Sequence, residues 1–259
     1  FVLIGALVGL LLLGGVATFI VMLATRHRPE PPQPRWRAEG RGALLVFLGW
    51  LVAFFVFNNL AALLLRPLPG GGLWAVPLGY AAHATFGVWL LLRVEGLSFG
   101  ELVAQVVPRA RLGKALLWAP GFLGLAALCV LIVALAMVPA LKGQANPQQE
   151  ILDLIRNAKG TPLQAVLFLT VAGLAPCFEE LMFRGYLLSW SGPRWGAAWS
   201  LAATSLLFGF IHLQPLALPV LATLGFVLGL AVRRSGSLWT SVLVHACWNG
   251  SVFLLMKLG

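Results

Sequence analysis

The stretch LTVAGLAPCFEELMFRGYLL, residues 169–188, is apolar over most of its length and yet carries two adjacent glutamates, Glu179 and Glu180. About 20 mostly apolar residues are enough for a helix to cross a bilayer, so a membrane helix is predicted here. A carboxylate inside a bilayer is costly and by default indicates a functional site. Arg184 follows Glu180 by four residues, lies on the same helical face and is expected to neutralise it. Glu179 points about 100° away and has no such partner in its own helix.

The remainder of the chain has the composition of a membrane protein. Of its 259 residues, 60% are hydrophobic and only 10% are charged, whereas soluble domains carry about 25% charged residues. The chain is therefore predicted to be an all-α polytopic membrane protein, with one transmembrane domain over residues 1–259 and a polar cavity among about eight helices. The predicted spans are residues 1–25, 43–65, 73–92, 115–141, 162–189, 196–213, 216–232 and 237–257.

The distribution of charge argues against a nucleic-acid partner, although the net charge is +10. The basic residues lie in the connections between apolar stretches, and the six acidic residues other than Glu179 and Glu180 lie in or beside polar, loop-like stretches. The connections after the first, third, fifth and seventh predicted spans carry 12 of the 18 Lys and Arg residues, and the opposite ones carry 5. The connections after the first, third, fifth and seventh spans are therefore predicted to be cytoplasmic. As an integral membrane protein, the chain is expected to be surrounded by lipid.

Two segments are predicted to depart from simple crossings. Residues 96–114 are too polar to span, and we expect an amphipathic helix at the interface, with Arg109, Arg111 and Lys114 at the headgroups. The 38 residues between Arg194 and Arg233 carry no charge and must hold two crossings and a turn. Such a tight hairpin is expected to turn before the far surface. This would place His212 inside the membrane, where irregular backbone is tolerated when it is buried in protein or lines a wet cavity.

Other polar residues occur within the predicted spans. His245 and Asn249 are four residues apart and project from one helical face. We predict a structural role for His83, and interhelical hydrogen bonds for Asn58 and Asn59. The three cysteines all lie in apolar stretches, and their spacing matches neither a zinc motif nor a disulfide framework.

Glu179, His212, His245 and Asn249 are residue types that suit the attack of water on an amide. A carboxylate with a histidine can deprotonate water, and a histidine with an asparagine can donate hydrogen bonds to a developing oxyanion. Other protease chemistries fit less well, because there is no HExxH sequence and the only aspartate, Asp153, lies in a predicted loop. A thiol nucleophile is disfavoured, because cysteine in an apolar helix usually behaves as a small hydrophobe.

A polar centre in a helix bundle has other uses. It also suits an ion- or proton-coupled transporter, whose acidic residues lie near the midplane. A non-catalytic membrane scaffold or immunity protein is a further alternative. The histidine and asparagine pair on one face distinguishes the protease, because a transporter does not need it.

Three motifs in the second half of the chain resemble those of a known family. They are Glu-Glu-x-x-x-Arg at 179–184, Phe-x-x-x-His at 208–212 and His-x-x-x-Asn at 245–249, in separate predicted spans within residues 160–255. Together they are similar to the motifs of the CAAX protease and bacteriocin-processing (CPBP, or Abi) family, which includes the Ras-converting CAAX endopeptidases. The resemblance implies an intramembrane endopeptidase, here of a bacterial cytoplasmic membrane. Its substrate would be a membrane-associated protein or peptide, prenylated or not, as in CAAX-type or bacteriocin processing.

The resemblance also implies roles for individual residues. Glu179 would be the general base, and His212 would help to hold the attacking water. His245 and Asn249 would form the oxyanion hole, and the supporting residues would be Glu180, Arg184 and Phe208. We expect these groups to surround a cavity that opens to the cytoplasmic side.

The family has been described both as metalloproteases and as metal-independent glutamate proteases. We favour the mechanism without a metal or other cofactor, because Arg184 already compensates the charge of Glu180. Zinc is the alternative, with Glu179, His212 and His245 as its ligands.

Overall fold

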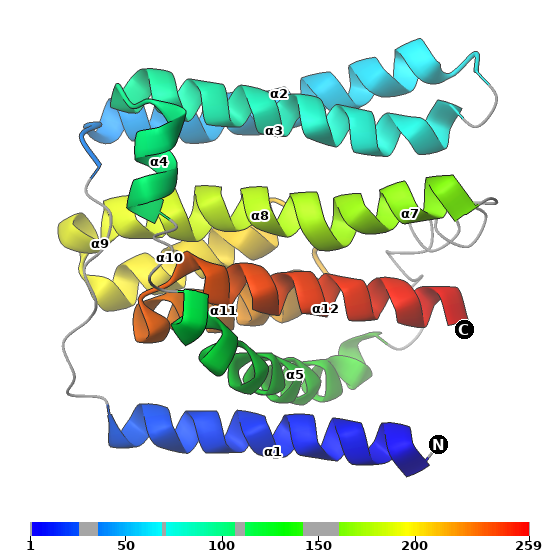
Figure 1. Ribbon diagram of the computed structural model, residues 1–259, viewed down its shortest axis with the longest axis vertical. Coiled ribbons are helices and arrows are strands. Elements are labelled where there is room, and N and C mark those ends of the chain that lie inside the picture. The colour runs from blue at the N-terminus through cyan, green and yellow to red at the C-terminus, as the bar shows by residue number, and fades with distance from the viewer. Residues whose placement is uncertain (1, 26–35, 69–70, 107–111, 142–160, 259) are drawn as a thin grey trace.

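The computed structural model describes residues 2–25, 36–68, 71–106, 112–141 and 161–258, and in these ranges every regular element is a helix (Figure 1). The separate helices are α1 (Val2–Ala24), α2 (Gly40–Leu65), α3 (Gly71–Glu95), α4 (Phe99–Val106), α5 (Leu112–Leu141), α10 (Ala197–Phe210), α11 (Leu218–Ser235) and α12 (Leu238–Leu258). One further helix changes its winding along its length and consists of α7 (Thr161–Leu169), η2 (Thr170–Leu174), α8 (Ala175–Glu180), η3 (Leu181–Leu188) and α9 (Ser189–Trp195).

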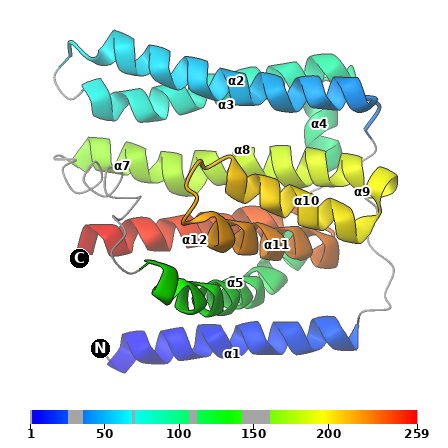
Figure 2. The same cartoon turned by 180° about the vertical axis from the view of Figure 1, so that it is seen from behind.

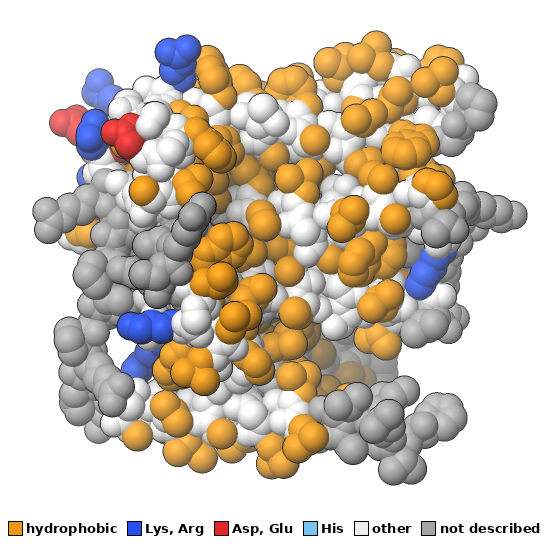
Figure 3. Space-filling view, viewed as in Figure 1, with side chains coloured by type: hydrophobic (Ala, Val, Ile, Leu, Met, Phe, Trp, Pro, Cys, Tyr) orange, Lys and Arg blue, Asp and Glu red, His pale blue; other side chains and the backbone are white. Residues whose placement is uncertain are grey.

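The lengths of these helices confirm the prediction of an all-α polytopic membrane protein. Two apolar helices are shorter than the others, Val8–Ala24 within α1 and Ala197–Phe210, which is α10. On the face shown in Figure 3, apolar side chains cover the middle, and Lys and Arg gather mainly at the end where α4 lies. Six helices of the described chain are long and apolar enough to cross a membrane: Gly40–Leu65, Gly71–Glu95, Leu112–Pro139, Pro162–Trp195, Leu218–Ser235 and Leu238–Lys257.

The helices lie side by side in a stack that places the three motifs in its interior (Figures 1 and 2). The hairpin of α2 and α3 forms one edge, and α1 forms the other edge against α5. The α7–α9 helix and α12 lie between them, and α11 packs against α5, α10 and α12. Both chain ends lie at the same end of the stack (Figure 1), as an even number of crossings requires.

The helix with the two glutamates is wound more widely on both sides of them. The π-helical segments η2 and η3 enclose the short α8, which ends at Glu180. Pro176 explains the first of these, because it has no N–H to bond to the preceding turn and its ring pushes that turn away. Such π-segments are frequent at functional sites.

The same helix is longer than predicted. The sequence indicated an end at residue 189, but the helix continues through Pro193 to Trp195. The guanidinium of Arg194 donates to the carbonyl of Trp190, one turn earlier in this helix, at 2.6 Å. Gly196, with φ of 80°, then ends the helix in a conformation that glycine adopts more readily than other residues. Glu179 consequently lies near the middle of the 34-residue span Pro162–Trp195.

The hairpin of α10 and α11 turns early, as predicted. The 14 residues of α10 extend over about 21 Å at roughly 1.5 Å per residue, less than the ~30 Å of a bilayer core. Figure 2 shows its turn about halfway along the neighbouring helices. Leu213, directly after His212, has φ of 54°, a strained conformation for leucine of a kind that clusters at functional sites.

The interfacial helix is shorter than predicted. Ser98 and Glu101 form a capping box at the start of α4, in which the carboxylate of Glu101 accepts the backbone N–H of Ser98 at 2.7 Å. Hydrogen bonds from the backbone and the hydroxyl of Ser98 lower the pKa of the Glu101 carboxyl. Leu102 and Val106 face the core, so α4 is amphipathic. The predicted segment extended too far, because residues 112–114, with Lys114, begin the apolar helix α5. Arg109 and Arg111 lie outside the described residues.

The prediction of interhelical hydrogen bonds for two asparagines was wrong. The amide groups of Asn58 and Asn59 donate to the carbonyls of Phe54 and Phe55, each at 2.8 Å within α2. A short amide side chain reaches the carbonyl of the preceding turn more easily than a neighbouring helix.

The sequence assigned Glu95 to a polar connection, whereas the structure buries it with only 2% exposure at the end of α3. Its carboxylate accepts the backbone N–H of Arg37 at 2.6 Å and the hydroxyl of Tyr186 at 3.0 Å. The indole N–H of Trp36 donates to Gly185 in η3 at 3.0 Å. These contacts attach the segment before α2 to η3.

Candidate active site

Glu180 is completely buried and compensated from two sides. Its Oε1 accepts a hydrogen bond from Arg184 Nη1 at 2.8 Å and another from His245 Nδ1 at 2.9 Å. The predicted ion pair with Arg184 is therefore formed. The other guanidinium nitrogen, Nη2, donates to the carbonyl of Gly225 at 2.9 Å. The Arg184 guanidinium also lies over the ring of Phe208, 4.4 Å from its centroid. These contacts hold the pair in one geometry.

The contact with Glu180 determines how His245 is protonated. An ionised carboxylate only accepts hydrogen bonds, so His245 Nδ1 must carry the proton of this contact. The other ring nitrogen, Nε2, faces Glu179, with 3.9 Å between it and Oε2. His245, on α12, therefore bonds to Glu180 and faces Glu179.

Glu179 has a different environment from its neighbour. Its side chain is 15% exposed, and its Oε1 accepts a hydrogen bond from the hydroxyl of Tyr80 on α3 at 3.0 Å. The distance to His245 is too long for a direct hydrogen bond. The sequence gives no indication of this role for Tyr80, because Tyr80 is far from the motifs along the chain and no spacing rule connects it with them.

Phe208 lies between the two histidines of the site. Its ring centroid is 5.0 Å from that of His212 and 5.7 Å from that of His245. His212 Nδ1 is 2.6 Å from the carbonyl of Phe208 and donates to it, which leaves Nε2 free of this contact. Among the described residues no hydrogen bond joins His212 to Glu179. His212 is thus linked to His245 by ring contacts with Phe208, which lies between them.

Asn249 lies one turn after His245 on α12, as the spacing predicted. Its amide Nδ2 donates to the carbonyl of Val171 at 3.1 Å, across to the π-helical segment η2. The amide has two N–H groups, so this bond leaves one of them for another acceptor. Asn249 and His245 thus both face the helix of the two glutamates.

The two histidines named as possible zinc ligands each have one ring nitrogen engaged, so only their Nε2 atoms could bind a metal ion. His245 Nδ1 is engaged with Glu180, and His212 Nδ1 is engaged with Phe208. In the part of the chain that the structure describes, no three His, Cys, Asp or Glu side chains are grouped so that they could hold a metal ion.

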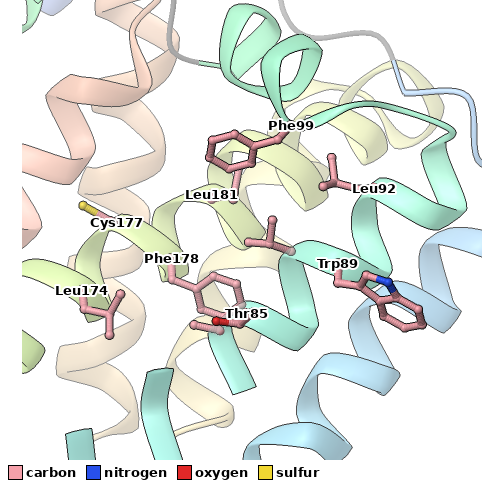
Figure 4. A pocket seen from close by; sticks show the side chains of 10 residues that line it. Thr85, Trp89, Leu92, Phe99, Leu174, Cys177, Phe178 and Leu181 are labelled. Carbon is pink, nitrogen blue, oxygen red and sulfur yellow. The ribbon is translucent and has the colours of Figure 1, made fainter. Parts of the chain in front are cut away.

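A groove of about 510 Å³ lies beside this site, between α3 and the α7–α9 helix (Figure 4). It is almost entirely apolar, and Phe99 of α4 lies at its rim (Figure 4). This groove is not the cavity that the sequence predicted, because none of the four expected catalytic side chains lines it. Phe178 and Leu181, next to the glutamates in sequence, do line it. The full lining consists of Ala84, Thr85, Val88, Trp89, Leu92, Phe99, Leu174, Cys177, Phe178 and Leu181.

His83 is buried in the packing between α3 and α8. Its ring makes edge contacts with Tyr80 and Phe178, at centroid distances of 4.3 and 5.5 Å. These contacts agree with the structural role that the sequence indicated for this residue.

Comparison with known proteins gives a match to a protein family. Residues 161–251 match the model of the family described as type II CAAX prenyl endopeptidase Rce1-like. No curated protein and no solved structure matches the chain. The matched segment holds all three motifs and the α7–α12 part of the bundle, but it leaves out α3 with Tyr80. The resemblance in the motifs is therefore confirmed, and residues 161–251 are similar to the type II CAAX prenyl endopeptidases.

Proposed function

We propose that this protein is an intramembrane endopeptidase in which Glu179 activates water to hydrolyse a peptide bond of a prenylated, membrane-associated protein or peptide. The observation that carries this proposal is the difference between the two adjacent carboxylates. Glu180 is fully buried and bonded to Arg184 and His245, whereas Glu179 is partly exposed and bonded to a neutral tyrosine. Only Glu179 is therefore available to take a proton.

The reaction follows from the groups that surround Glu179. One carboxylate oxygen accepts a proton from water while the water oxygen bonds to the carbonyl carbon of the substrate. The carbonyl electrons move to its oxygen, which becomes an oxyanion. When the C–N bond breaks, the proton held by Glu179 passes to the leaving nitrogen. His212, with Nε2 free, helps to hold the water.

His245 and Asn249 are the proposed donors to the oxyanion. Since His245 Nδ1 donates to Glu180, its Nε2 carries a hydrogen only when the ring is cationic. One such donor contributes about 3 kcal/mol to transition-state stabilisation in other proteases.

The apolar groove is the proposed site for the prenyl chain. Its lining residues Cys177, Phe178 and Leu181 lie within two positions of Glu179 or Glu180 on the same helix. A prenyl group in the groove would thus bring the adjoining peptide to the carboxylate. The volume of about 510 Å³ is in the range of small-molecule sites.

Cleavage of an internally quenched peptide with a farnesylated CAAX end tests this function. We expect the purified protein in liposomes to cleave it, with a lower KM than for the same peptide without the prenyl group. Thr85→Trp should raise the KM for the farnesylated peptide about 10-fold, because an indole would occupy the groove. Cleavage of the unprenylated peptide should not change.

Val52→Trp, on the exposed face of α2 away from the groove, is the matched control. An equal KM for both peptides would exclude the prenyl site. If neither peptide were cleaved while the liposomes carried a proton flux, the transporter alternative would be favoured.

A second prediction concerns metal. Because Glu180 is already bonded to Arg184 and His245, we propose a mechanism without zinc. Purified protein should then contain less than one equivalent of zinc by mass spectrometry, and chelation should leave the cleavage rate unchanged. Stoichiometric zinc whose removal abolishes activity, with recovery on adding it back, would contradict this mechanism.

We also propose that the site opens to the cytoplasmic side. Most Lys and Arg residues lie in the connections of that predicted side. Thr85→Cys, in a variant without the three native cysteines, should react with a membrane-impermeant thiol reagent in inverted vesicles and not in intact cells. The reverse pattern would place the opening on the other side.

A further inference from the structure

Tyr80 touches the proposed base from outside the segment that resembles the endopeptidase family. It lies on α3, whereas the family match begins at residue 161. Its hydroxyl donates to Glu179 Oε1 at 3.0 Å. We propose that Tyr80 is a positioning residue that holds the Glu179 carboxylate in the orientation from which its other oxygen takes a proton from water. This inference rests on the proposed function.

The geometry explains why such a residue is needed. A glutamate side chain has several rotatable bonds, so a free carboxylate samples many orientations. With Oε1 held by Tyr80, Oε2 remains 3.9 Å from His245 Nε2. That distance is too long for a direct hydrogen bond, so Oε2 keeps its lone pairs for another partner. If the carboxylate were released, it could swing onto His245 and pair with it directly, and the base would be lost.

Tyr80 is itself held by packing. Its ring lies 4.3 Å from that of His83, three residues later on α3, with an interplanar angle of 74°. His83 in turn packs against Phe178, the residue before Glu179. Both ends of the Tyr80–Glu179 bond are therefore attached to one packed cluster, and this keeps their separation constant.

The chain contains a matched internal control. It has only two tyrosines, and each donates to a glutamate at 3.0 Å: Tyr80 to Glu179, and Tyr186 to Glu95. The second bond lies at the end of α3 and connects it with η3. Removing either hydroxyl is the same chemical change, but only the first one touches the proposed base.

Kinetics of Tyr80→Phe and Tyr186→Phe separate a positioning role from a structural one. The phenylalanine keeps the ring contacts and removes only the bond to the carboxylate. For Tyr80→Phe we expect kcat on the farnesylated peptide to fall about 10-fold or more, with KM and thermal stability near those of the parent. Tyr186→Phe should lower thermal stability and leave kcat unchanged. In the Glu179→Asp background, whose shorter side chain withdraws from the hydroxyl, Tyr80→Phe should have little further effect.

A spectroscopic measurement tests the same bond without any activity. Tyrosine labelled with ¹³C at Cζ gives two signals, and the one absent from Tyr80→Phe belongs to Tyr80. Glu179→Gln should shift that signal and leave the other in place, whereas Glu95→Gln should shift only the signal of Tyr186.

The outcomes distinguish this inference from the proposed function. Normal cleavage by Glu179→Gln would overturn the proposed base. Loss of cleavage in Glu179→Gln, together with normal kcat in Tyr80→Phe, would overturn only the positioning role. An unshifted Tyr80 signal in Glu179→Gln would do the same even if no peptide were cleaved.

Discussion

Replacement of Glu179 by glutamine is expected to lower kcat by about 10²–10⁴, the usual contribution of a general base. The amide keeps the size of the side chain and can still accept the hydrogen bond from Tyr80, but it cannot take a proton from water. The fold should survive, since a neutral amide is less costly to bury than a charge. The rate is to be measured with the quenched farnesylated peptide under saturating conditions.

Glu101→Gln is the control for this change. It makes the same substitution at an exposed carboxylate on α4, which lies outside the site, and should leave kcat unchanged. Cleavage at a near-normal rate by Glu179→Gln would contradict the assignment of Glu179 as the general base. Loss of activity with a large fall in melting temperature would indicate that Glu179 supports the fold instead.

Glu180→Ala is expected to destabilise the protein by about 3–5 kcal/mol, the cost of leaving a buried charge without its partner. Arg184 would remain with only 2% exposure and without a carboxylate, held by the carbonyl of Gly225 and the ring of Phe208. His245 would lose the acceptor that orients its ring. The temperature of thermal unfolding in detergent should therefore be lower, and activity should fall as well.

The double variant Glu180→Leu with Arg184→Leu separates these two effects. Removing both charges of a buried pair is often close to neutral for stability, so the double variant should regain much of the lost stability. It should remain impaired in catalysis, because His245 still lacks its partner. If Glu180→Ala unfolded at the parent temperature and lost only activity, Glu180 would be catalytic or a ligand, and its supporting role would be wrong.

The contrast between the adjacent glutamates explains why both are kept in one helix. Successive helical residues point in directions about 100° apart, so one can face the packed interior while the other faces the substrate side. Glu180 uses its charge to hold Arg184 and His245. Glu179 faces Tyr80 on α3 and keeps part of its side chain exposed.

Much of this protein could be predicted from local patterns in the chain. Long apolar stretches determine the membrane helices, because unpaired backbone groups cannot lie in lipid. The interval from Glu180 to Arg184 predicts their ion pair, and the interval from His245 to Asn249 predicts their shared face, since residues four apart in a helix are neighbours. The short hairpin around His212 also follows from the uncharged length between Arg194 and Arg233.

Contacts between distant segments could not be predicted in this way. No local pattern indicates that Tyr80 reaches Glu179, that His245 bonds to Glu180, or that Glu95 is buried against Tyr186. Each of these bonds joins residues at least 65 positions apart, and periodicity describes only neighbours within one helix. The sequence by itself thus determined the helices, the ion pair within one of them and the candidate motifs. Only the tertiary structure decided which partners the two glutamates gain from other helices, His245 for Glu180 and Tyr80 for Glu179, because those contacts depend on how α12 and α3 pack against the helix that carries both.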